Sequence, residues 1–314
     1  MNRQSIIIDC DPGQDDAVNL LLAMASPDEL DLLGITTVAG NVPLNLCQRN
    51  ARLMCDIAGR EDMPVYAGCV RPMVRKLITA EYVHGKTGID GVEIVEPRTP
   101  LQDEHAVDFI IDTLLERDPG TITLVPTGPL TNVALAMIKE PTIVERIQQI
   151  VLMGGAMREG GNYSPSAEFN IMVDPHAAHV VFDCGRPITA MGLDVTHTVL
   201  STQARIARLR DIGNDAATAT ANMLDFYQRY DQLKYGTDGG PLHDPCTVAW
   251  LLQPELFEGK DCNVAVEISS ELTMGNTAVD FWDVTDRPAN AHWIHTADAD
   301  GFYQLLMERL HHYG

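Results

Sequence analysis

Near its N-terminus the chain reads Ser5-Ile-Ile-Ile-Asp-Cys-Asp-Pro-Gly-Gln-Asp-Asp-Ala-Val-Asn-Leu-Leu-Leu-Ala-Met-Ala25. Residues 5–9 form a short, β-branched apolar run that is typical of a buried strand. Residues 17–25 are almost all apolar and predict a helix packed behind that strand. An aspartate-rich loop joins the two. A strand, a short loop and a helix in this order are the beginning of a βαβ unit.

The same alternation of strand and helix patterns continues along the chain. We predict further strands at 32–38, 65–67, 121–125, 149–153 and 187–192, and further helices at 44–58, 105–115, 129–138, 175–182 and 248–252. Such a series favours an α/β fold with one open, mainly parallel sheet and helices on both faces. No Ser/Gly/Pro-rich linker divides the chain, so we predict a single domain over 1–314 rather than two. Ligands in such sheets bind beyond the carboxyl ends of the strands, where we expect the active site.

Composition and charge exclude several classes of protein. Of the 314 residues, 45% are hydrophobic and 21% are charged, which is typical of a soluble globular chain with a large core. The 22 basic and 44 acidic residues give a net charge of −22. A chain this acidic repels polyphosphates and anionic membranes, so we expect neither a nucleic-acid polymer nor a membrane as a partner. Its acidity is compatible with simple solubility and also with cation binding.

The cysteines and the N-terminal sequence indicate a cytoplasmic protein. The seven cysteines are odd in number and include no Cys-x-x-Cys pair, so we predict reduced core thiols rather than disulfides or a zinc site. The first residues lack the basic region and long apolar stretch of a signal peptide, and no run of 18 apolar residues follows. We therefore expect neither secretion nor a membrane span.

The loop after the first predicted strand carries four carboxylates: Asp9, Asp11, Asp15 and Asp16. Like charges this close raise each other's pKa unless a cation or hydrogen-bond donors offset them. Capping of the following helix would explain Asp15 or Asp16, because a helix N-terminus favours anions. Capping needs only one or two of the four, however. A hard cation that binds oxygen, such as Ca²⁺ or Mg²⁺, accounts for the whole cluster.

Three other known motifs, a calcium loop, a phosphatase motif and a phosphate-binding loop, match this part of the sequence less well. A calcium loop of the EF-hand type beginning at Asp9 requires glycine and glutamate where this chain has Gln14 and Leu20. A phosphatase of the Asp-x-Asp type would use Asp9 as nucleophile and Asp11 as acid, and this alternative stays open. The Gly-Lys-Thr at 85–87 lacks the upstream glycine of a phosphate-binding loop, which disfavours nucleoside triphosphates.

Two further loops are rich in polar groups. The first, residues 161–170, contains Asn162, Glu168 and Asn170. The second, residues 241–246, precedes a predicted helix. Asp244 before a proline fits an ordinary helix N-cap, and His243 beside it fits either a satisfied loop histidine or a general acid. Asp174 also precedes a proline, and we assign it a structural role.

Five motifs in order resemble the nucleoside hydrolases, both the inosine-uridine-preferring type and their pyrimidine-specific bacterial relatives. They are Asp9-Cys-Asp-Pro-Gly-x-Asp-Asp-Ala17, Val-Pro-Thr-Gly-Pro-Leu-Thr-Asn at 125–132, Met-Gly-Gly-Ala at 153–156, Ala-Glu-Phe-Asn at 167–170 and Leu-His-Asp-Pro-Cys at 242–246. The motifs extend from Ile6 to about Trp250. The resemblance implies hydrolysis of the N-glycosidic bond of ribonucleosides to free base and ribose, with pyrimidine nucleosides favoured and inosine also accepted.

The resemblance also implies a metal site and two catalytic residues. One Ca²⁺ would be held at the bottom of the pocket by Asp11, Asp16, the main-chain carbonyl of Thr127 and Asp244. Asp11 would also be the general base that deprotonates a bound water. His243 would be the acid at the leaving base. Breaking the bond builds positive charge on the ribose, which nearby carboxylates stabilise.

The same matching implies binding residues for both halves of the substrate. The ribose hydroxyls would be held by Asp15, Asn41, Asn162, Glu168 and Asn170. The base would lie among His84, Met153, Phe169, Tyr227 and Tyr230, although the two tyrosines also fit packing against their own helix. Relatives in the family are homodimers or homotetramers. A calcium-dependent nucleoside- or ribose-binding protein without hydrolytic activity is the alternative from another class.

Overall fold

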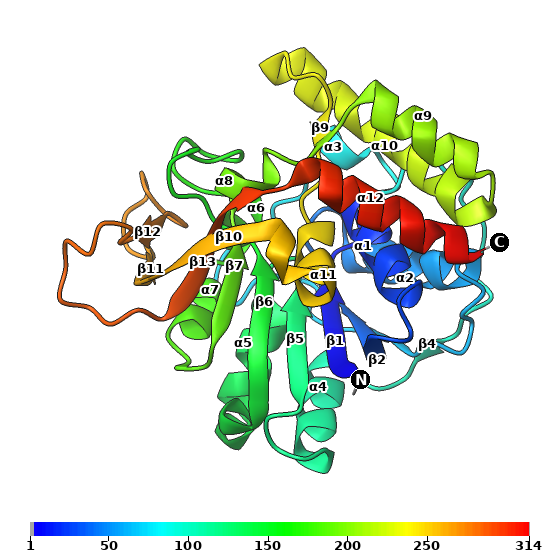
Figure 1. The fold of residues 1–314 in the computed structure, drawn as a ribbon. Helices are drawn as coiled ribbons and strands as arrows, with labels where there is room; N and C mark the ends of the chain where they lie inside the picture. The colour runs from blue at the N-terminus through cyan, green and yellow to red at the C-terminus, as the bar shows by residue number, and fades with distance from the viewer. Residues whose placement is uncertain (1–2, 314) are drawn as a thin grey trace.

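The computed structural model describes residues 3–313, which form a central sheet with helices on both of its faces (Figure 1). The strands of this sheet are β1 (Gln4–Cys10), β2 (Leu30–Thr37), β3 (Val65–Ala67), β4 (Leu101–Gln102), β5 (Ile122–Pro126), β6 (Ile147–Met153), β7 (Ile188–Met191), β10 (Phe257–Cys262) and β13 (Ala291–Ala297). Their spatial order is β10-β13-β7-β6-β5-β1-β2-β3-β4. Neighbouring strands are parallel except β10, which runs antiparallel to β13 at one edge. The predicted fold class is confirmed.

The remaining elements surround this sheet. Two small antiparallel pairs are formed by β8 (Leu200–Ser201) with β9 (Gly240–Pro241) and by β11 (Val264–Val266) with β12 (Thr277–Val279). The helices are α1 (Gln14–Met24), α2 (Leu44–Ile57), α3 (Glu81–His84), α4 (Ala106–Glu116), α5 (Thr131–Lys139), α6 (Phe169–Val173), α7 (Pro175–Phe182), α8 (Leu193–Thr196), α9 (Gln203–Ile212), α10 (Asp215–Tyr235), α11 (Pro245–Leu252) and α12 (Ala299–Leu310). Within the described residues, no helix has the length and apolar character needed to cross a membrane.

The apolar run of β1 supplies both layers of the core because successive side chains of a strand point to opposite faces. Ile6 and Ile8 pack into the core beneath α1, α2, α11 and α12. Ile7 packs into the core on the other face, beneath α4, α5 and α7. All three isoleucines are almost completely buried. This explains why the strand has a continuous apolar sequence instead of an alternating one.

The strand order changes direction at β1. The chain proceeds from β1 to β2, β3 and β4 on one side, and then returns to place β5, β6 and β7 on the other. The loops after β1 and β5 therefore meet at the carboxyl edge of the sheet, where the Thr127 amide donates a 2.8 Å hydrogen bond to the Asp9 carbonyl. Ligands bind at such a topological switch point. In Figure 1, α10 crosses above this edge beside α3.

The structure corrects two parts of the predicted element series. The helix predicted at 129–138 begins only at Thr131, because Pro129 lies in the turn after β5. The sequence analysis also assigned no helix to residues 203–225 and no element beyond residue 252, yet α9 and the first half of α10 lie in the first range, and β10, β13 and α12 lie in the second. The edge strand β10 has charged residues at Glu258, Lys260 and Asp261, and such polar edge strands have little hydrophobic periodicity.

Candidate active site

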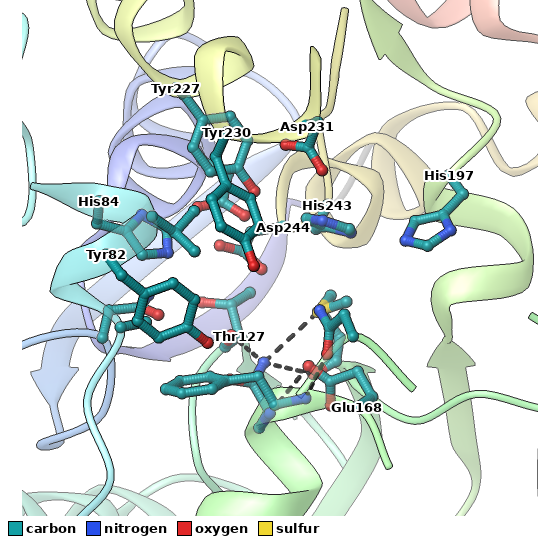
Figure 2. Close-up of a pocket in the computed structure, with 18 of the residues that line it drawn as sticks. Tyr82, His84, Thr127, Glu168, His197, Tyr227, Tyr230, Asp231, His243 and Asp244 are labelled. Atoms are coloured by element: carbon teal, nitrogen blue, oxygen red, sulfur yellow. Dashed lines mark hydrogen bonds between the residues drawn. The ribbon is translucent and has the colours of Figure 1, made fainter. Parts of the chain in front are cut away.

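A cleft opens over the switch point, between the carboxyl edge of the sheet and the underside of α10. Its empty volume is about 670 Å³, open solvent at the mouth included. Figure 2 shows Glu168 on one side of this cleft and Tyr227, Tyr230 and Asp231 on the other, with His243 and Asp244 between them. No lysine or arginine of the described chain lines the cleft.

Almost every residue selected from the sequence lies at this cleft. The lining includes the five residues assigned to the ribose: Asp15, Asn41, Asn162, Glu168 and Asn170. It also includes the five assigned to the base: His84, Met153, Phe169, Tyr227 and Tyr230. Thr127, His243 and Asp244 line it as well, whereas Asp11 and Asp16 lie completely buried beneath its floor. The structure thus brings all these residues to one place.

Three carboxylates form a compact group on the floor of the cleft. Asp15 and Asp16 come from the first turn of α1, and Asp244 comes from the residue before α11. One oxygen from each lies within 4.8 Å of the other two, an arrangement that could hold a metal ion. The metal ligands implied by the family included Asp11 instead of Asp15. Asp11 lies outside this group of three, so the geometry gives Asp15 the closer relation to Asp16 and Asp244.

The structure shows which of the aspartates beside helix N-termini cap a helix through their side chains. Gly13, not an aspartate, is the N-cap of α1, and its amide donates a 3.1 Å hydrogen bond to Asp16 Oδ2. Asp244 makes no side-chain capping hydrogen bond, so its carboxylate remains free for the cluster. Asp174 does cap α7, accepting from the Ala177 amide at 3.1 Å. Asp174 therefore caps its helix through its side chain, whereas Asp244 occupies the predicted N-cap position of α11 without a side-chain capping bond.

Several oxygens of this floor have no hydrogen-bond partner among residues 3–313. Asp11 Oδ2 accepts a 2.6 Å hydrogen bond from the Asn41 amide, but Asp11 Oδ1 is buried without a partner. Asp15 Oδ1 is in the same situation. Asp16 Oδ1 accepts from Thr127 Oγ1 at 2.7 Å. Buried carboxylate oxygens without donors are costly, and they are the ligands that hard divalent cations prefer.

The pKa values of the floor carboxylates also indicate a site for a cation. Burial raises the pKa of Asp15 to about 6 and that of Asp16 to about 7. For Asp11 and Asp244, burial and the neighbouring carboxylates raise the pKa well above its usual value. No cationic side chain offsets these charges in the lining. The residues present therefore fit a divalent cation, which would allow all of them to be ionised at neutral pH.

Asp9 has a different role from the rest of the acidic loop. Its Oδ1 accepts hydrogen bonds from Thr36 Oγ1 at 2.6 Å and from Asn132 Nδ2 at 2.8 Å. It is buried and does not line the cleft. Asp9 thus connects the end of β1 with β2 and α5, and a phosphatase mechanism would have no accessible nucleophile there.

The loop from β6 to α6 holds its polar residues through main-chain contacts. Glu168 accepts from the amides of Asn170 at 2.9 Å, Gly155 at 3.0 Å and Ile171 at 3.1 Å. Burial nevertheless raises the pKa of Glu168 to about 7. Asn170 Nδ2 donates to the Thr127 carbonyl at 2.8 Å. These contacts fix both side chains at the edge of the floor, where they can bind hydroxyl groups.

One wall of the cleft is aromatic. His84 stacks on Tyr227 with ring centroids 5.4 Å apart and an angle of 23° between the rings. His84 Nδ1 lies 2.7 Å from Gln14 Oε1, and because Gln14 Nε2 donates to the His84 carbonyl at 2.9 Å, the imidazole donates this bond. Burial lowers the pKa of His84 to about 3, so the ring is neutral. A flat aromatic wall of this kind suits a nucleobase.

His243 lies between the floor and the base side of the cleft. Its Nδ1 is 2.6 Å from Thr196 Oγ1, and its ring centroid is 5.7 Å from that of His197. Burial, and then the neighbouring histidines, lower the pKa of His243 well below its usual value. His197 in turn contacts Glu159 Oε2 at 3.1 Å near the surface. His243 is therefore a neutral imidazole with one N–H proton.

Comparison with known proteins agrees with the geometry. A family model described as inosine-uridine preferring nucleoside hydrolase matches residues 6–304. The chain belongs to the nucleoside hydrolase family. It is 53% identical to an uncharacterized protein of Schizosaccharomyces pombe, over 97% of this chain and 98% of that one. It is 48% identical to the pyrimidine-specific ribonucleoside hydrolase RihA of Photobacterium profundum, over 98% and 99% of the two chains.

A solved structure shares the architecture as well. The purine-preferring ribonucleoside hydrolase from Gardnerella vaginalis superposes with a TM-score of 0.91 and 35% identity, over 99% of both chains. The predictions of this family and of a ribonucleoside hydrolase enzyme are confirmed.

Six lining residues of this nucleoside hydrolase cleft were not selected from its sequence: Ala80, Tyr82, Val83, His197, Asp231 and Tyr235. Asp231 lies four residues after Tyr227 on α10, and residues at this spacing share one face of a helix. That spacing was a usable signal for Asp231. Tyr82 lies in the short helix α3 and His197 directly after α8, so neither belongs to a periodic pattern and their positions depend on the tertiary fold.

The buried carboxylates should make the stability of the hydrolase depend on pH and metal together. Because the pKa values of Asp15 and Asp16 are raised on folding, their contribution to stability is complete below about pH 4 and is lost as the pH rises through 6 to 7. We expect metal-stripped protein to melt at a lower temperature at pH 8 than at pH 5. Added Ca²⁺ should raise the melting temperature, and more at pH 8, because it binds the ionised carboxylates.

Thermal unfolding followed by circular dichroism, at both pH values with and without Ca²⁺, tests this expectation. The stabilisation should amount to about 2.7 kcal/mol at a hundredfold excess of Ca²⁺ over its Kd. Asp244→Asn should remove most of it, whereas Asp28→Asn, at an exposed position, should leave it intact. Equal melting temperatures in all four conditions would contradict the assignment of the floor as a cation site.

Proposed function

We propose that this chain hydrolyses the N-glycosidic bond of ribonucleosides to free base and ribose, as one catalytic domain over 1–314. The observation that carries this proposal is the cleft itself, in which a floor of buried carboxylates faces a wall formed by His84 and Tyr227. The floor suits a polyhydroxyl group and the wall suits a planar base. Because no cationic side chain lines the cleft, a neutral nucleoside fits it better than a nucleotide.

The metal of this proposal is Ca²⁺, held by Asp11, Asp16, the Thr127 carbonyl and Asp244, with Asp15 beside them in the same group of carboxylates as Asp16 and Asp244. When bound, Ca²⁺ supplies a positive charge that orients the ribose diol and lowers the pKa of a neighbouring water. The Thr127 carbonyl accepts one bond from Asn170 and keeps a second lone pair for a ligand. Oxygen donors of this number and kind are typical of calcium sites.

Asp11 is the proposed general base. Its Oδ1 has no hydrogen-bond partner, while its Oδ2 is fixed by the Asn41 amide. Two glycines allow the carboxylate to sit this deeply, because a Cβ built on Gly128 would lie 2.5 Å from Asp11 Oδ1 and one on Gly40 would overlap Asp11 Oδ2. The free oxygen is thus available to take a proton from a water at the floor.

The other polar residues act on the two parts of the substrate. Glu168, Asn170, Asn162 and Asn41 line the cleft where they can hold ribose hydroxyls, and the carboxylates stabilise positive charge that develops on the ring. His243, with its single N–H proton, donates a hydrogen bond to the departing base. This hydrogen bond stabilises the negative charge that grows on the departing base.

The base preference follows from the relatives. We propose that pyrimidine nucleosides are favoured and inosine is accepted. In support, the Photobacterium relative, at 48% identity, is named as pyrimidine-specific. The Gardnerella structure, at 35% identity, is named as purine-preferring despite its TM-score of 0.91. The fold alone therefore does not set the preference, and side chains at the base end of the cleft must do so.

We further propose a cytoplasmic homodimer or homotetramer. The cytoplasmic location is supported by the seven cysteines, which are all free thiols in the structure. The oligomeric state is supported by the family resemblance.

Release of reducing ribose from uridine, cytidine, inosine and adenosine tests the proposed reaction. The assay should be run on native protein, on metal-stripped protein and after restoration of Ca²⁺. We expect release that depends on Ca²⁺ and is faster from uridine and cytidine than from inosine and adenosine. If no nucleoside yields ribose while Ca²⁺ remains bound, the chain is a nucleoside-binding protein instead of a hydrolase.

Substitution Asp11→Asn tests the general base. The amide keeps the size of the side chain but cannot take up a proton, so we expect kcat to fall by at least about 10²-fold. The melting temperature should not fall, because the change removes a buried charge. A kcat within tenfold of the wild-type value would exclude Asp11 as the base.

Substitution His243→Ala tests assistance to the leaving base. We expect kcat/KM for uridine to fall by about 10²–10⁴-fold. The loss should be much smaller with a nitrophenyl riboside, whose leaving group departs without a proton. Equal losses on the two substrates would assign His243 a positioning role only.

A further inference from the structure

The ring of His243 contacts a buried hydroxyl group to which the reaction described so far assigns no role. Thr196 Oγ1 lies 2.6 Å from His243 Nδ1. Thr196 is completely buried and does not line the cleft, so a ligand in the cleft does not reach it. A side chain in this position can act on the reaction only through the imidazole that it contacts.

Backbone pairing brings Thr196 and His243 together although 47 positions separate them in the chain. Thr196 is the last residue of the short helix α8, and the chain then continues into β8. β8 pairs with β9, and one step further along this pair the Leu242 amide donates to the Val199 carbonyl at 2.8 Å. The end of α8 and the segment that carries His243 are therefore held side by side by main-chain hydrogen bonds.

The surroundings of the hydroxyl determine the direction of this hydrogen bond. Within residues 3–313, Thr196 Oγ1 has no hydrogen-bond partner besides His243 Nδ1. If the imidazole donated the bond, the hydroxyl proton would be buried without an acceptor, which is costly. The hydroxyl therefore donates, and the lone pair of Nδ1 accepts. Since a neutral imidazole carries one N–H proton, that proton lies on Nε2.

The second nitrogen of the ring is the one that a ligand can reach. His243 lines the cleft, and its Nε2 has no hydrogen-bond partner in the described part of the chain. The neighbouring His197, seen beside His243 in Figure 2, contacts Glu159 Oε2 at 3.1 Å instead. An Nε2–H group can donate to a departing base, whereas an unprotonated Nε2 would present a lone pair to its growing negative charge. The tautomer thus decides whether His243 assists or opposes the departure of the base.

We propose that Thr196 is a positioning residue that holds His243 as its Nε2–H tautomer and directs this N–H toward the leaving base. The hydroxyl does so by donating to Nδ1, which also fixes the orientation of the ring. This inference rests on the proposed hydrolysis, because the N–H acts on a base that leaves. A purely structural hydroxyl, by contrast, would have the same effect whether or not His243 is present.

A double-mutant cycle measured with two substrates tests this role. Thr196→Val replaces the hydroxyl by a methyl group of similar size, and kcat/KM is measured with uridine and with a nitrophenyl riboside in the presence of Ca²⁺. We expect the uridine value to fall by about 10- to 100-fold, because Nδ1 loses its buried donor. The nitrophenyl value should stay close to that of the wild type, because this leaving group departs without a proton. In a His243→Ala background, Thr196→Val should cause no further loss on uridine.

Three results would each overturn the role of Thr196. The first is a kcat/KM for uridine in Thr196→Val that lies within twofold of the wild-type value. The second is an equal loss on uridine and on the nitrophenyl riboside. The third is a loss on uridine that persists in full when His243 is already replaced by alanine, since a hydroxyl acting through the imidazole cannot act without it.

Matched variants separate the hydroxyl from general damage to the fold. Thr196→Ser keeps the hydroxyl and should retain most of the activity on uridine, whereas Thr196→Ala should lose as much as Thr196→Val. This Ser and Ala pair differs by the hydroxyl alone, so it replaces the valine variant if that protein does not fold. Thr198→Val removes an exposed hydroxyl that donates to the Val195 carbonyl at 2.7 Å, and it should leave both kcat/KM values unchanged.

Nitrogen NMR reads the tautomer directly and distinguishes this inference from the proposed hydrolysis. In protein labelled with ¹⁵N at its histidines, the His243 signals are those missing from His243→Ala. We expect Nε2 to be protonated and Nδ1 to be unprotonated in the wild type, and the Nδ1 resonance to move in Thr196→Val. A protonated Nδ1 in the wild type, or an unchanged Nδ1 resonance in the variant, would overturn the role of Thr196 even if ribose is released. If no ribose is released but both spectra are as expected, the hydrolysis is wrong and the control of the tautomer by Thr196 stands.

Discussion

The burial of four carboxylates in one small volume is the constraint on which the rest of this structure depends. Asp11, Asp15, Asp16 and Asp244 are almost completely buried, and no cationic side chain lines the cleft above them. The protein offsets part of this charge with amide and hydroxyl donors, such as the amide of Gly13. The remaining unpaired oxygens require a cation from solution. Because the negative charge of these carboxylates is only partly compensated until a metal binds, the stability of the folded protein depends on metal binding.

The parallel sheet makes this arrangement possible because its switch point brings distant segments together. Asp9 joins the ends of β1 and β2 with α5 through Thr36 and Asn132, and Asn132 also donates to the Thr37 carbonyl at 3.0 Å. These contacts fix the strand ends from which the acidic loop departs. The carboxylate floor is thus supported by side chains that do not line the cleft.

The sequence predicted the fold class and most of the floor because the relevant residues are close together in the chain. Asp11, Asp15 and Asp16 lie within one loop and one helical turn, where an excess of charge is visible without a structure. The aspartate before Pro245 and the one before Pro175 look alike in sequence, and only tertiary packing shows that the first is free and the second caps a helix. Asp231 was missed because a single acid on a long helix resembles a solvent-exposed residue.

The His84 ring lies directly against Gly13, so the residues that can occupy these two positions depend on each other. A Cβ added to Gly13 would collide with the His84 ring, and Gln14 holds that ring in place. One wall of the base site is therefore coupled to the same helical turn that supplies the metal floor. The other half of this aromatic wall, Tyr227, comes from α10, some 200 residues later in the chain. Substitutions on α10 can thus alter this aromatic wall without changing any residue of the carboxylate floor.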